Sequence, residues 1–373
     1  MKKLQIGAIY VGGFVGPFTG QALAVVLPEF AETFDITVAQ AALTISAYLF
    51  PFATMMLFSG RLVRKIPPHK VILTAYAVTL PFALALLITP SWFFFLLCFA
   101  VIGIANAFTT PVFQMMLREL TPPESLGSAL GTYAAMQSLG MLSAPLISGL
   151  STLVSWRLAF LATILTSAFI LLVRVPVVPS PDSSPQRVTG QIQWGPVGVQ
   201  MFSSFVVGIG VMGLGFLAAL YVGDEFGLGP VGRGLVIMCG GTAAFLTARP
   251  IGGLADRYGT RAILVSAALV AAVALFLFPL ATWVWLLILA WALTIMAGQG
   301  IQATVNLAVI GGPGGSSLIS TVQAFRFFGT AAAPVVFLPI YTGIGGPVFW
   351  VPAAALLVVA VLQQLNPGNR RND

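Results

Sequence analysis

The chain has 373 residues, of which 58% are hydrophobic and only 7% are charged, and its mean hydropathy is +0.99. A soluble domain carries about 25% charged residues, so this composition excludes a soluble globular protein. The formal net charge of +7 comes from basic residues in short gaps between apolar stretches. Such residues set membrane topology, and they do not indicate nucleic-acid binding.

Apolar stretches follow one another along the whole chain, and each has the length of about 20 residues that a helix needs to cross a bilayer. In lipid every backbone group must bond internally, a condition that helices satisfy. The sequence therefore predicts an all-α membrane protein with twelve spans. In chain order they cover residues 7–28, 40–60, 70–90, 92–117, 125–150, 156–176, 195–221, 230–251, 261–280, 283–310, 316–343 and 346–365.

Basic residues indicate the orientation of these spans, because Lys and Arg concentrate in cytoplasmic loops. With the N-terminus inside, fourteen of the 17 Lys and Arg residues lie on the cytoplasmic side, whereas Arg157 and Arg233 lie outside. The remaining one, Arg326, falls within the eleventh span. We expect a monomeric, multi-pass protein of the cell (inner or plasma) membrane with both termini in the cytoplasm.

A central segment rich in Pro and Ser divides the spans six and six, which predicts a linker. We predict an N-terminal six-helix half over 1–176, a cytoplasmic linker over 177–194 and a C-terminal six-helix half over 195–373. The halves echo each other, because Gly140 and Pro145 recur as Gly329 and Pro334 at a constant offset of 189 residues. Internal repeats of this kind are typical of transporter folds.

The loop after the eighth span reads RPIGGLADRYGTR over 249–261. It resembles the loop motif G-x-L-a-D-R-x-G-r-r of the major facilitator superfamily. The resemblance implies two pseudo-symmetric six-helix halves, and it implies that Asp256 contacts a neighbouring helix end to lock one conformation. By the symmetry of the halves, we place that helix end at the start of the fifth span near Ser125. The residues to which it assigns a gating role are Gly252, Asp256, Arg257, Gly259 and Arg261.

The fifth span resembles the exporter motif of the same family, G-x8-G-x3-G-P-x2-G-G, which is associated with antiporters that expel drugs or metabolites. Ala144 and Ser148 replace two of its glycines. Tight packing of a membrane helix against its neighbours is the alternative explanation for these small residues. The residues predicted to act in conformational change are Gly131, Gly140, Pro145 and Gly149.

Two positions depart from the exporter pattern. Many such exporters carry Asp in the first span and Arg in the fourth, and the matching residues here are Thr19 and Phe99. In the family both positions are tied to proton coupling, so the usual coupling residues are missing. Glu29, at the end of the first span, is the candidate that remains for proton coupling, and an ordinary interfacial carboxylate is the alternative.

Arg326 is the central candidate for substrate binding, because a charge inside a bilayer costs several kcal/mol and indicates function. Arginine stays protonated, so it cannot carry a proton, but it can hold an anionic or strongly polar group. A structural arginine bonded to helix carbonyls is the alternative. Uncharged polar residues within the spans complete the predicted path, unless they join helices instead. They are Gln21, Asn106, Gln137, Gln200, Gln299 and Asn306, and Gln302 shares a helix face with Asn306.

These features predict a secondary active transporter that moves a small amphipathic molecule by alternating access, with efflux by proton antiport as the first choice. The alternatives are uptake or facilitated diffusion of an organic anion held by Arg326, and a non-transporting membrane receptor. The expected partners are a small-molecule substrate, the lipid bilayer and, for antiport, protons. No enzymatic activity, cofactor, metal or nucleic acid is expected.

Overall fold

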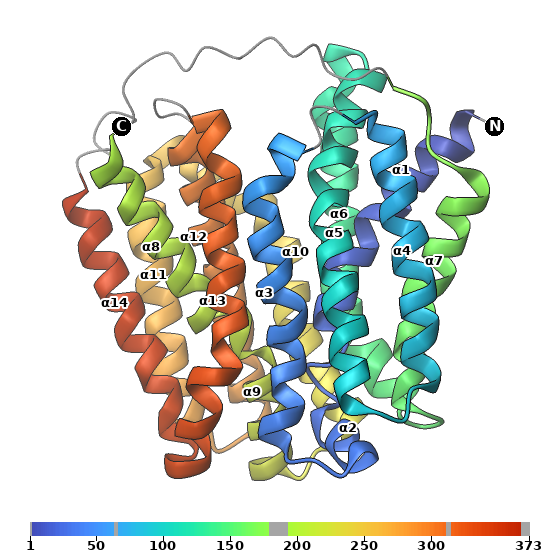
Figure 1. Ribbon diagram of the computed structural model, residues 1–373. Helices are drawn as coiled ribbons and strands as arrows, with labels where there is room; N and C mark the ends of the chain where they lie inside the picture. The colour runs from blue at the N-terminus through green and yellow to red at the C-terminus, as the bar shows by residue number, and fades with distance from the viewer. Residues whose placement is uncertain (1, 63–65, 179–192, 311–314, 367–373) are drawn as a thin grey trace. The chain divides into compact units, whose positions relative to one another are not determined.

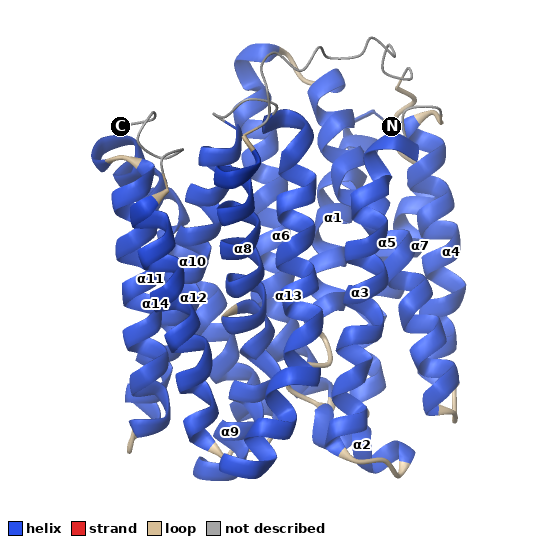
Figure 2. Ribbon diagram, turned by 60° about the vertical axis from the view of Figure 1, so that its left-hand side comes forward, coloured by secondary structure: helices blue, strands red, loops and turns tan. Residues whose placement is uncertain are grey.

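The computed structural model describes residues 2–62, 66–178, 193–310 and 315–366, and within these ranges the regular elements are all helices (Figure 2). Among the described residues, ten helical segments are long and apolar enough to cross a membrane. The predicted all-α membrane fold is confirmed, since a helix or a pair of short helices covers each of the twelve predicted spans. The predicted linker over 177–194 lies mostly outside the described residues.

The chain forms two compact units, and the first comprises Met1–Ser184 together with Pro230–Gly234 (Figure 1). Its last segment, Pro230–Gly234, is the first turn of a helix that continues in the second unit. The elements of the first unit are α1 (Lys2–Gln21), α2 (Leu27–Phe34), α3 (Val38–Leu62), α4 (Pro68–Ile88), α5 (Trp92–Leu120), α6 (Pro123–Ser151), the 3₁₀ turn η2 (Trp156–Phe160), α7 (Leu161–Val173) and that first turn of α10 (Pro230–Tyr258).

The second unit comprises Pro185–Gly229 and Leu235–Asp373. Its elements are α8 (Trp194–Gly210), η3 (Met212–Leu214), α9 (Gly215–Phe226), the rest of α10, α11 (Thr260–Leu277), η4 (Phe278–Leu280), α12 (Val284–Ile310), α13 (Gly315–Ile344), η5 (Gly346–Phe349) and α14 (Trp350–Leu365).

The first helix of each unit is interrupted, which corrects the prediction of continuous spans over 7–28 and 195–221. In the first unit α1 ends at Gln21 and the chain turns through 22–26 before α2 begins. In the second unit α8 ends at Gly210, again 189 residues later, and η3 separates it from α9. Both interruptions are apolar and buried, so hydropathy alone does not distinguish them from helix. In Figure 1, α2 lies at the end of its unit opposite the N-terminus, and α9 lies opposite the C-terminus.

A close backbone contact repeats in the two units. A Cβ on Gly140 of α6 would collide with the carbonyl oxygen of Phe14 in α1, and a Cβ on Gly329 of α13 would collide with that of Phe205 in α8. Small residues permit such close approach between membrane helices. The equivalence of the two contacts supports the internal repeat that the sequence predicts.

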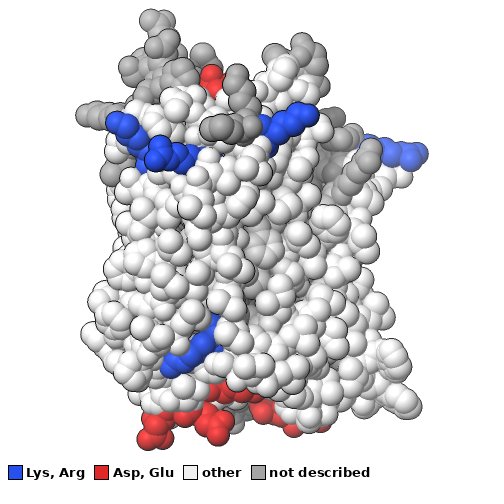
Figure 3. Space-filling model, turned by 90° about the vertical axis from the view of Figure 1, so that its right-hand side faces the viewer, with Lys and Arg blue, Asp and Glu red and all other residues white. Residues whose placement is uncertain are grey.

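Charged side chains separate along the helix direction. On the face drawn in Figure 3, most acidic side chains gather at one end and most basic ones lie near the other, while one acidic group lies at the basic end and one basic group lies just above the acidic end. This separation agrees with helices that cross a membrane, and it leaves the basic end as the predicted cytoplasmic side.

We expect Gly140→Ala to destabilise the protein, because its Cβ would meet the backbone of α1 and force the two helices apart. Overpacking of this kind costs about 1–3 kcal/mol, which a lower midpoint of thermal unfolding in detergent would report. Gly131→Ala is the matched control on the same helix, since Gly131 is exposed and has nothing within 4 Å of a built Cβ. The control should be neutral or slightly stabilising, because Ala favours helix over Gly by about 1 kcal/mol. Equal midpoints for the two variants would contradict the close contact.

Candidate functional site

Arg326 lies deep within the membrane-spanning part of α13. It follows the start of α13 by eleven residues, or about 16 Å along the helix axis. Its side chain is half-buried, its Nε is buried without a hydrogen-bond partner, and its Cζ lies 4.5 Å from the centroid of the Phe327 ring. A cation–π contact of this kind offsets only part of the loss of water.

The interruption of α8 lies directly against Arg326. A Cβ on Gly208 would collide with the carbonyl oxygen of Arg326, so the last turn of α8 packs on the backbone of α13 at this residue. The hydroxyl of Thr330 lies 3.0 Å from the carbonyl oxygen of Arg326 and 3.2 Å from that of Gly208, to either of which it can donate. Interrupted helices in corresponding positions of two repeats are a general indicator of a transporter binding site. Arg326 and the end of α8 therefore form the core of the candidate site.

Four arginines with described side chains are buried or half-buried, and three of them have oxygen partners. Arg157 donates to the carbonyls of Leu86 and Thr89, each at 2.8 Å. Arg233 pairs with the carboxylate of Glu29. Arg261 donates to the carbonyl of Gln364 near the end of α14. In the described part of the chain Arg326 has no such oxygen.

Polar residues on α12 give partial support to the predicted path in the second unit. Gln302 Nε2 donates to Asn306 Oδ1 at 3.0 Å, which confirms the predicted shared face, and Gln302 Oε1 is buried without a partner. Gln299 is half-buried on the same helix. The substrate contacts of Asn306 and Gln299 stay predictions.

Gln200 is engaged in a contact between α8 and α14. It is buried, and Gln363 Nε2 donates to its Oε1 at 3.0 Å and to Ser203 Oγ at 2.8 Å. The reverse bond, from Gln200 Nε2 to Gln363 Oε1, measures 3.4 Å. This geometry favours the interhelical alternative for Gln200. Sequence analysis missed Gln363, although an amide within the last apolar stretch already indicated a buried hydrogen bond.

In the first unit, the predicted residue Asn106 lies in a buried network of α1, α3 and α5. Asn106 Nδ2 donates to Tyr48 Oη at 3.0 Å, and Tyr48 Oη donates to the carbonyl of Gly16 at 3.3 Å. Asn106 Oδ1 is buried without a partner. Gln137 Nε2, on α6, donates to Thr110 Oγ1 of α5 at 3.4 Å, a partner that sequence analysis did not identify. No described contact joins these two groups directly to Gln21.

Gln21 itself is the last residue of α1, half-buried at the start of the interruption. The two positions that depart from the exporter pattern are occupied by packed, neutral groups. Thr19 is fully buried, with its hydroxyl 2.8 Å from that of Thr163 on α7. Phe99 is 1% exposed, and the centroid of its ring lies 4.8 Å from that of the Tyr48 ring. Neither position offers an ionisable group.

The predicted gating loop is described in part. Gly259 has φ +84°, a left-handed conformation that favours glycine, and it joins α10 to α11. Arg257 is exposed over the ring of Tyr258. Arg261 binds the carbonyl at the end of α14, where a cation complements the helix dipole. Gly252 and the side chain of Asp256 lie outside the described part, so the contact predicted for Asp256 stays a prediction.

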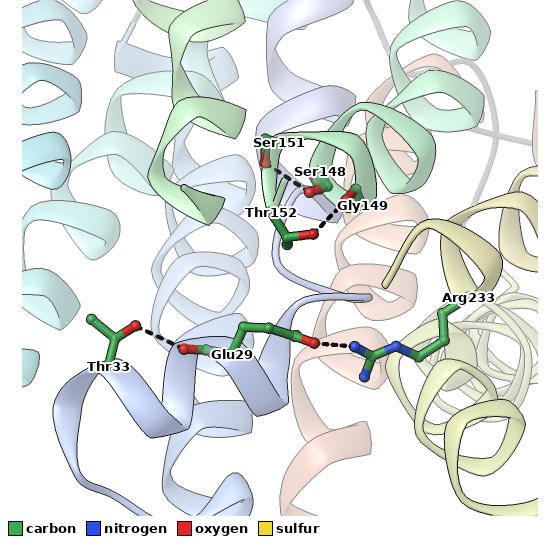
Figure 4. A network of polar contacts seen from close by, with 7 residues as sticks. All are labelled: Glu29, Thr33, Ser148, Gly149, Ser151, Thr152 and Arg233. Carbon is green, nitrogen blue, oxygen red and sulfur yellow. Dashed lines mark hydrogen bonds and ion pairs between the residues drawn. The ribbon is translucent and has the colours of Figure 1, made fainter. Parts of the chain in front are cut away.

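Glu29, the candidate for proton coupling, lies in the first turn of α2. Its Oε1 accepts a hydrogen bond from Arg233 Nη2, and its Oε2 is buried without a partner (Figure 4). The side chain of Glu29 is 27% exposed and that of Arg233 is 6% exposed. The two residues therefore form an ion pair with limited access to water.

We expect Gln363→Leu to lower the stability of the protein, because it removes the buried amide that bonds to Gln200 and Ser203. An unpaired buried polar group costs about 1–3 kcal/mol, which thermal unfolding in detergent would report. The neighbouring Gln364 is exposed, so Gln364→Leu is a control with the same chemical change and should leave the midpoint nearly unchanged. A Gln363→Leu variant as stable as the control would contradict an interhelical role for Gln200.

Several bacterial transport proteins are similar to this chain in sequence. YybF and YuxJ of Bacillus subtilis (strain 168), both MFS-type transporters, are 26% identical over 254 residues and 28% identical over 258 residues. These alignments cover 64% and 63% of this chain and 62% and 64% of the relatives. The inner membrane transport protein YnfM of Escherichia coli (strain K12) is 29% identical over 138 residues, 37% of this chain and 33% of YnfM. The chain therefore spans less than two thirds of these relatives.

A solved structure and a family model bear on the fold and the family. The human organic anion transporter MFSD10 (TETRAN) superposes with a TM-score of 0.73 at 16% identity, over 97% of this chain and 99% of that one, which shows a shared fold. The model of the Major Facilitator Superfamily matches residues 9–198, half of the chain. The protein thus belongs to the Major Facilitator Superfamily of membrane transporters.

Proposed function

We propose that this protein transports a small amphipathic molecule that carries an anionic or strongly polar group, and that Arg326 holds that group. The observation that carries the proposal is that the guanidinium of Arg326 has no oxygen partner among the described residues. Arg157, Arg233 and Arg261 each bind an oxygen, whereas Arg326, deep in α13, has the ring of Phe327 and an unpartnered Nε. An anionic cargo supplies the oxygens that the described residues do not.

The chemistry of the guanidinium suits this role. Its planar fork matches carboxylate and phosphate groups with two parallel hydrogen bonds. The ring of Phe327 beside it gives the apolar part of an amphipathic molecule a surface to contact. Among the described residues no carboxylate lies near the middle of a span to balance a cationic cargo, which disfavours cationic drugs.

Export is the direction that we propose. The resemblance of α6 to the exporter motif supports this direction. Uptake or facilitated diffusion of the same organic anion is the second candidate, supported by the neutral groups at Thr19 and Phe99, where proton-coupled exporters of the family carry charges.

For export by proton antiport, we propose Glu29 as the residue that binds the proton. Its carboxylate has one oxygen on Arg233 and one without a partner. Protonation would remove the charge that Arg233 binds, so that proton binding and the ion pair exclude each other. This exclusivity is the property that a coupling residue needs.

We expect Arg326→Ala to weaken binding of the anionic members of a compound panel by about 10–100-fold. A hydrogen bond to a charged group contributes about 1.5–3 kcal/mol, and about 1.4 kcal/mol corresponds to tenfold in affinity. Ligand-induced shifts of the unfolding midpoint measure this, and neutral members should change little. Arg118→Ala removes an exposed cation from the end of α5 and should leave all affinities unchanged. Intact binding of anions by Arg326→Ala would refute the assignment.

We expect a proton gradient across proteoliposomes to accelerate flux of the transported compound in the opposite direction, and Glu29→Gln to abolish this response. The amide of the variant cannot take up a proton, so its flux should follow the substrate gradient alone. The measurement compares initial flux with and without the pH gradient in both orientations. Wild-type flux that ignores the pH gradient would leave facilitated diffusion, and a Glu29→Gln variant that still responds would move the proton site elsewhere.

A further inference from the structure

Tyr48 and Asn106 form a hydrogen-bond relay where α1, α3 and α5 meet in the first unit. Both residues are buried. The Tyr48 hydroxyl lies 3.3 Å from the carbonyl oxygen of Gly16 and 3.0 Å from Asn106 Nδ2. A carbonyl oxygen can only accept, so the single proton of the Tyr48 hydroxyl goes to Gly16. The hydroxyl then accepts from Asn106, and the direction of both bonds is set.

The relay fixes which side of the Asn106 amide is engaged. A carboxamide donates through its nitrogen and accepts through its oxygen. Because Nδ2 is bonded to Tyr48, Oδ1 is left on the other side, and it is buried without a hydrogen-bond partner among the described residues. Buried polar atoms are normally paired, so an unpaired one needs a reason. The first unit thus presents an acceptor of fixed orientation that lacks a donor.

Close packing holds the relay in place. A Cβ on Gly103 of α5 would collide with the carbonyl oxygen of Tyr48 in α3, and a Cβ on Gly20 of α1 would lie 3.3 Å from the Tyr48 ring. The ring of Phe99, one turn before Gly103, has its centroid 4.8 Å from that of Tyr48. These contacts leave the amide little freedom to turn Oδ1 toward another protein group. A polar atom held in this way is preorganised to bind one functional group.

A row of polar residues on α5 leads to this oxygen. Asn106, Thr110 and Gln114 are four residues apart and share one face of the helix. Asn106 is buried, Thr110 is half-buried and Gln114 is exposed. Gln137 Nε2 donates to Thr110 Oγ1 at 3.4 Å, which is long for a hydrogen bond, so a polar molecule can replace this bond at low cost. The row gives a polar group a route from the exposed residue Gln114 to Asn106.

We propose that Asn106 Oδ1 binds a hydrogen-bond donor of the transported molecule, a hydroxyl or an N–H group, and that Tyr48 is the positioning residue that sets this preference. This assignment rests on the proposed function and deepens it, because the cargo gains a donor group in addition to the anionic group assigned to Arg326. A group that only accepts, such as an ether oxygen, meets the lone pairs of Oδ1 and is disfavoured. The cargo is then an amphipathic anion that also carries a hydroxyl or N–H group.

The test compares two series of probes, ω-hydroxyalkanoates of increasing chain length and the ω-methoxyalkanoates of matching length. Increasing the length removes the dependence on how far the donor lies from the carboxylate. Affinities for the purified full-length protein come from ligand-induced shifts of the unfolding midpoint. A site built to bond a hydroxyl discriminates strongly against analogues that cannot pair with it. At the lengths that bind, we expect the hydroxyl probe to bind about tenfold or more tightly than its methoxy partner.

Three variants identify the residues behind this preference. Asn106→Leu should abolish it by weakening the hydroxyl probe. Tyr48→Phe should reduce it by strengthening the methoxy probe, because the freed amide can turn Nδ2 toward the ether oxygen, whereas loss of structure alone would weaken both probes together. Gln114→Leu removes an exposed amide from the same helix and should leave the preference unchanged.

The wild-type protein overturns the subsite if no hydroxyl probe binds more tightly than its methoxy partner at any chain length, including the case in which neither binds. A preference that survives Asn106→Leu overturns it too, and one that is unchanged in Tyr48→Phe overturns the positioning role. The anion site fails differently. Arg326→Ala should weaken both series by the same factor and keep their ratio, so unchanged carboxylate binding in that variant refutes the proposed function, whereas the ratio alone decides on Asn106.

Discussion

Backbone contact of α1 with α6 in the first unit, and of α8 with α13 in the second, is the constraint on which the site depends. The contacts of Gly140 with Phe14 and of Gly329 with Phe205 leave no room for a side chain between the helices. In the second unit the same packing continues to Gly208, where the backbone of α8 meets that of Arg326. The position of the guanidinium beside the interruption of α8 thus follows from helix packing. A bulkier residue at Gly208 or Gly329 would move the charge as well as the helix.

Much of the fold was predictable because length and hydrophobicity are strong signals in lipid. Each predicted span contains one helix or two shorter ones, and the repeat offset seen in Gly140 and Gly329 reappears in the ends of α1 and α8. The interruptions after Gln21 and Gly210 were not predictable from the same signal, since their residues are as apolar as the helices on either side. An apolar side chain reports burial, and it carries no information on whether its backbone is helical.

The site was predictable only where a residue type is unusual for its surroundings. A cation in an apolar run, as at Arg326, stands out in any sequence. An amide does not, because Gln200, which bonds to Gln363, and Gln299 look alike in sequence. The Glu29–Arg233 pair was hidden for another reason. Its members are 204 residues apart, each lies at the end of a span, and each alone is an ordinary interfacial charge.

Thr19 and Phe99 carry no ionisable group, so under the proposed function Arg326 has no counter-charge at these positions. Where an intramembrane carboxylate is present, a buried arginine can exchange cargo for that internal partner. Here the described spans provide no such carboxylate, so the guanidinium is either solvated or paired with cargo. Excluding water from an unpaired charge costs much more than excluding it from a pair. Closure of the site around Arg326 is therefore favoured when the anion is bound.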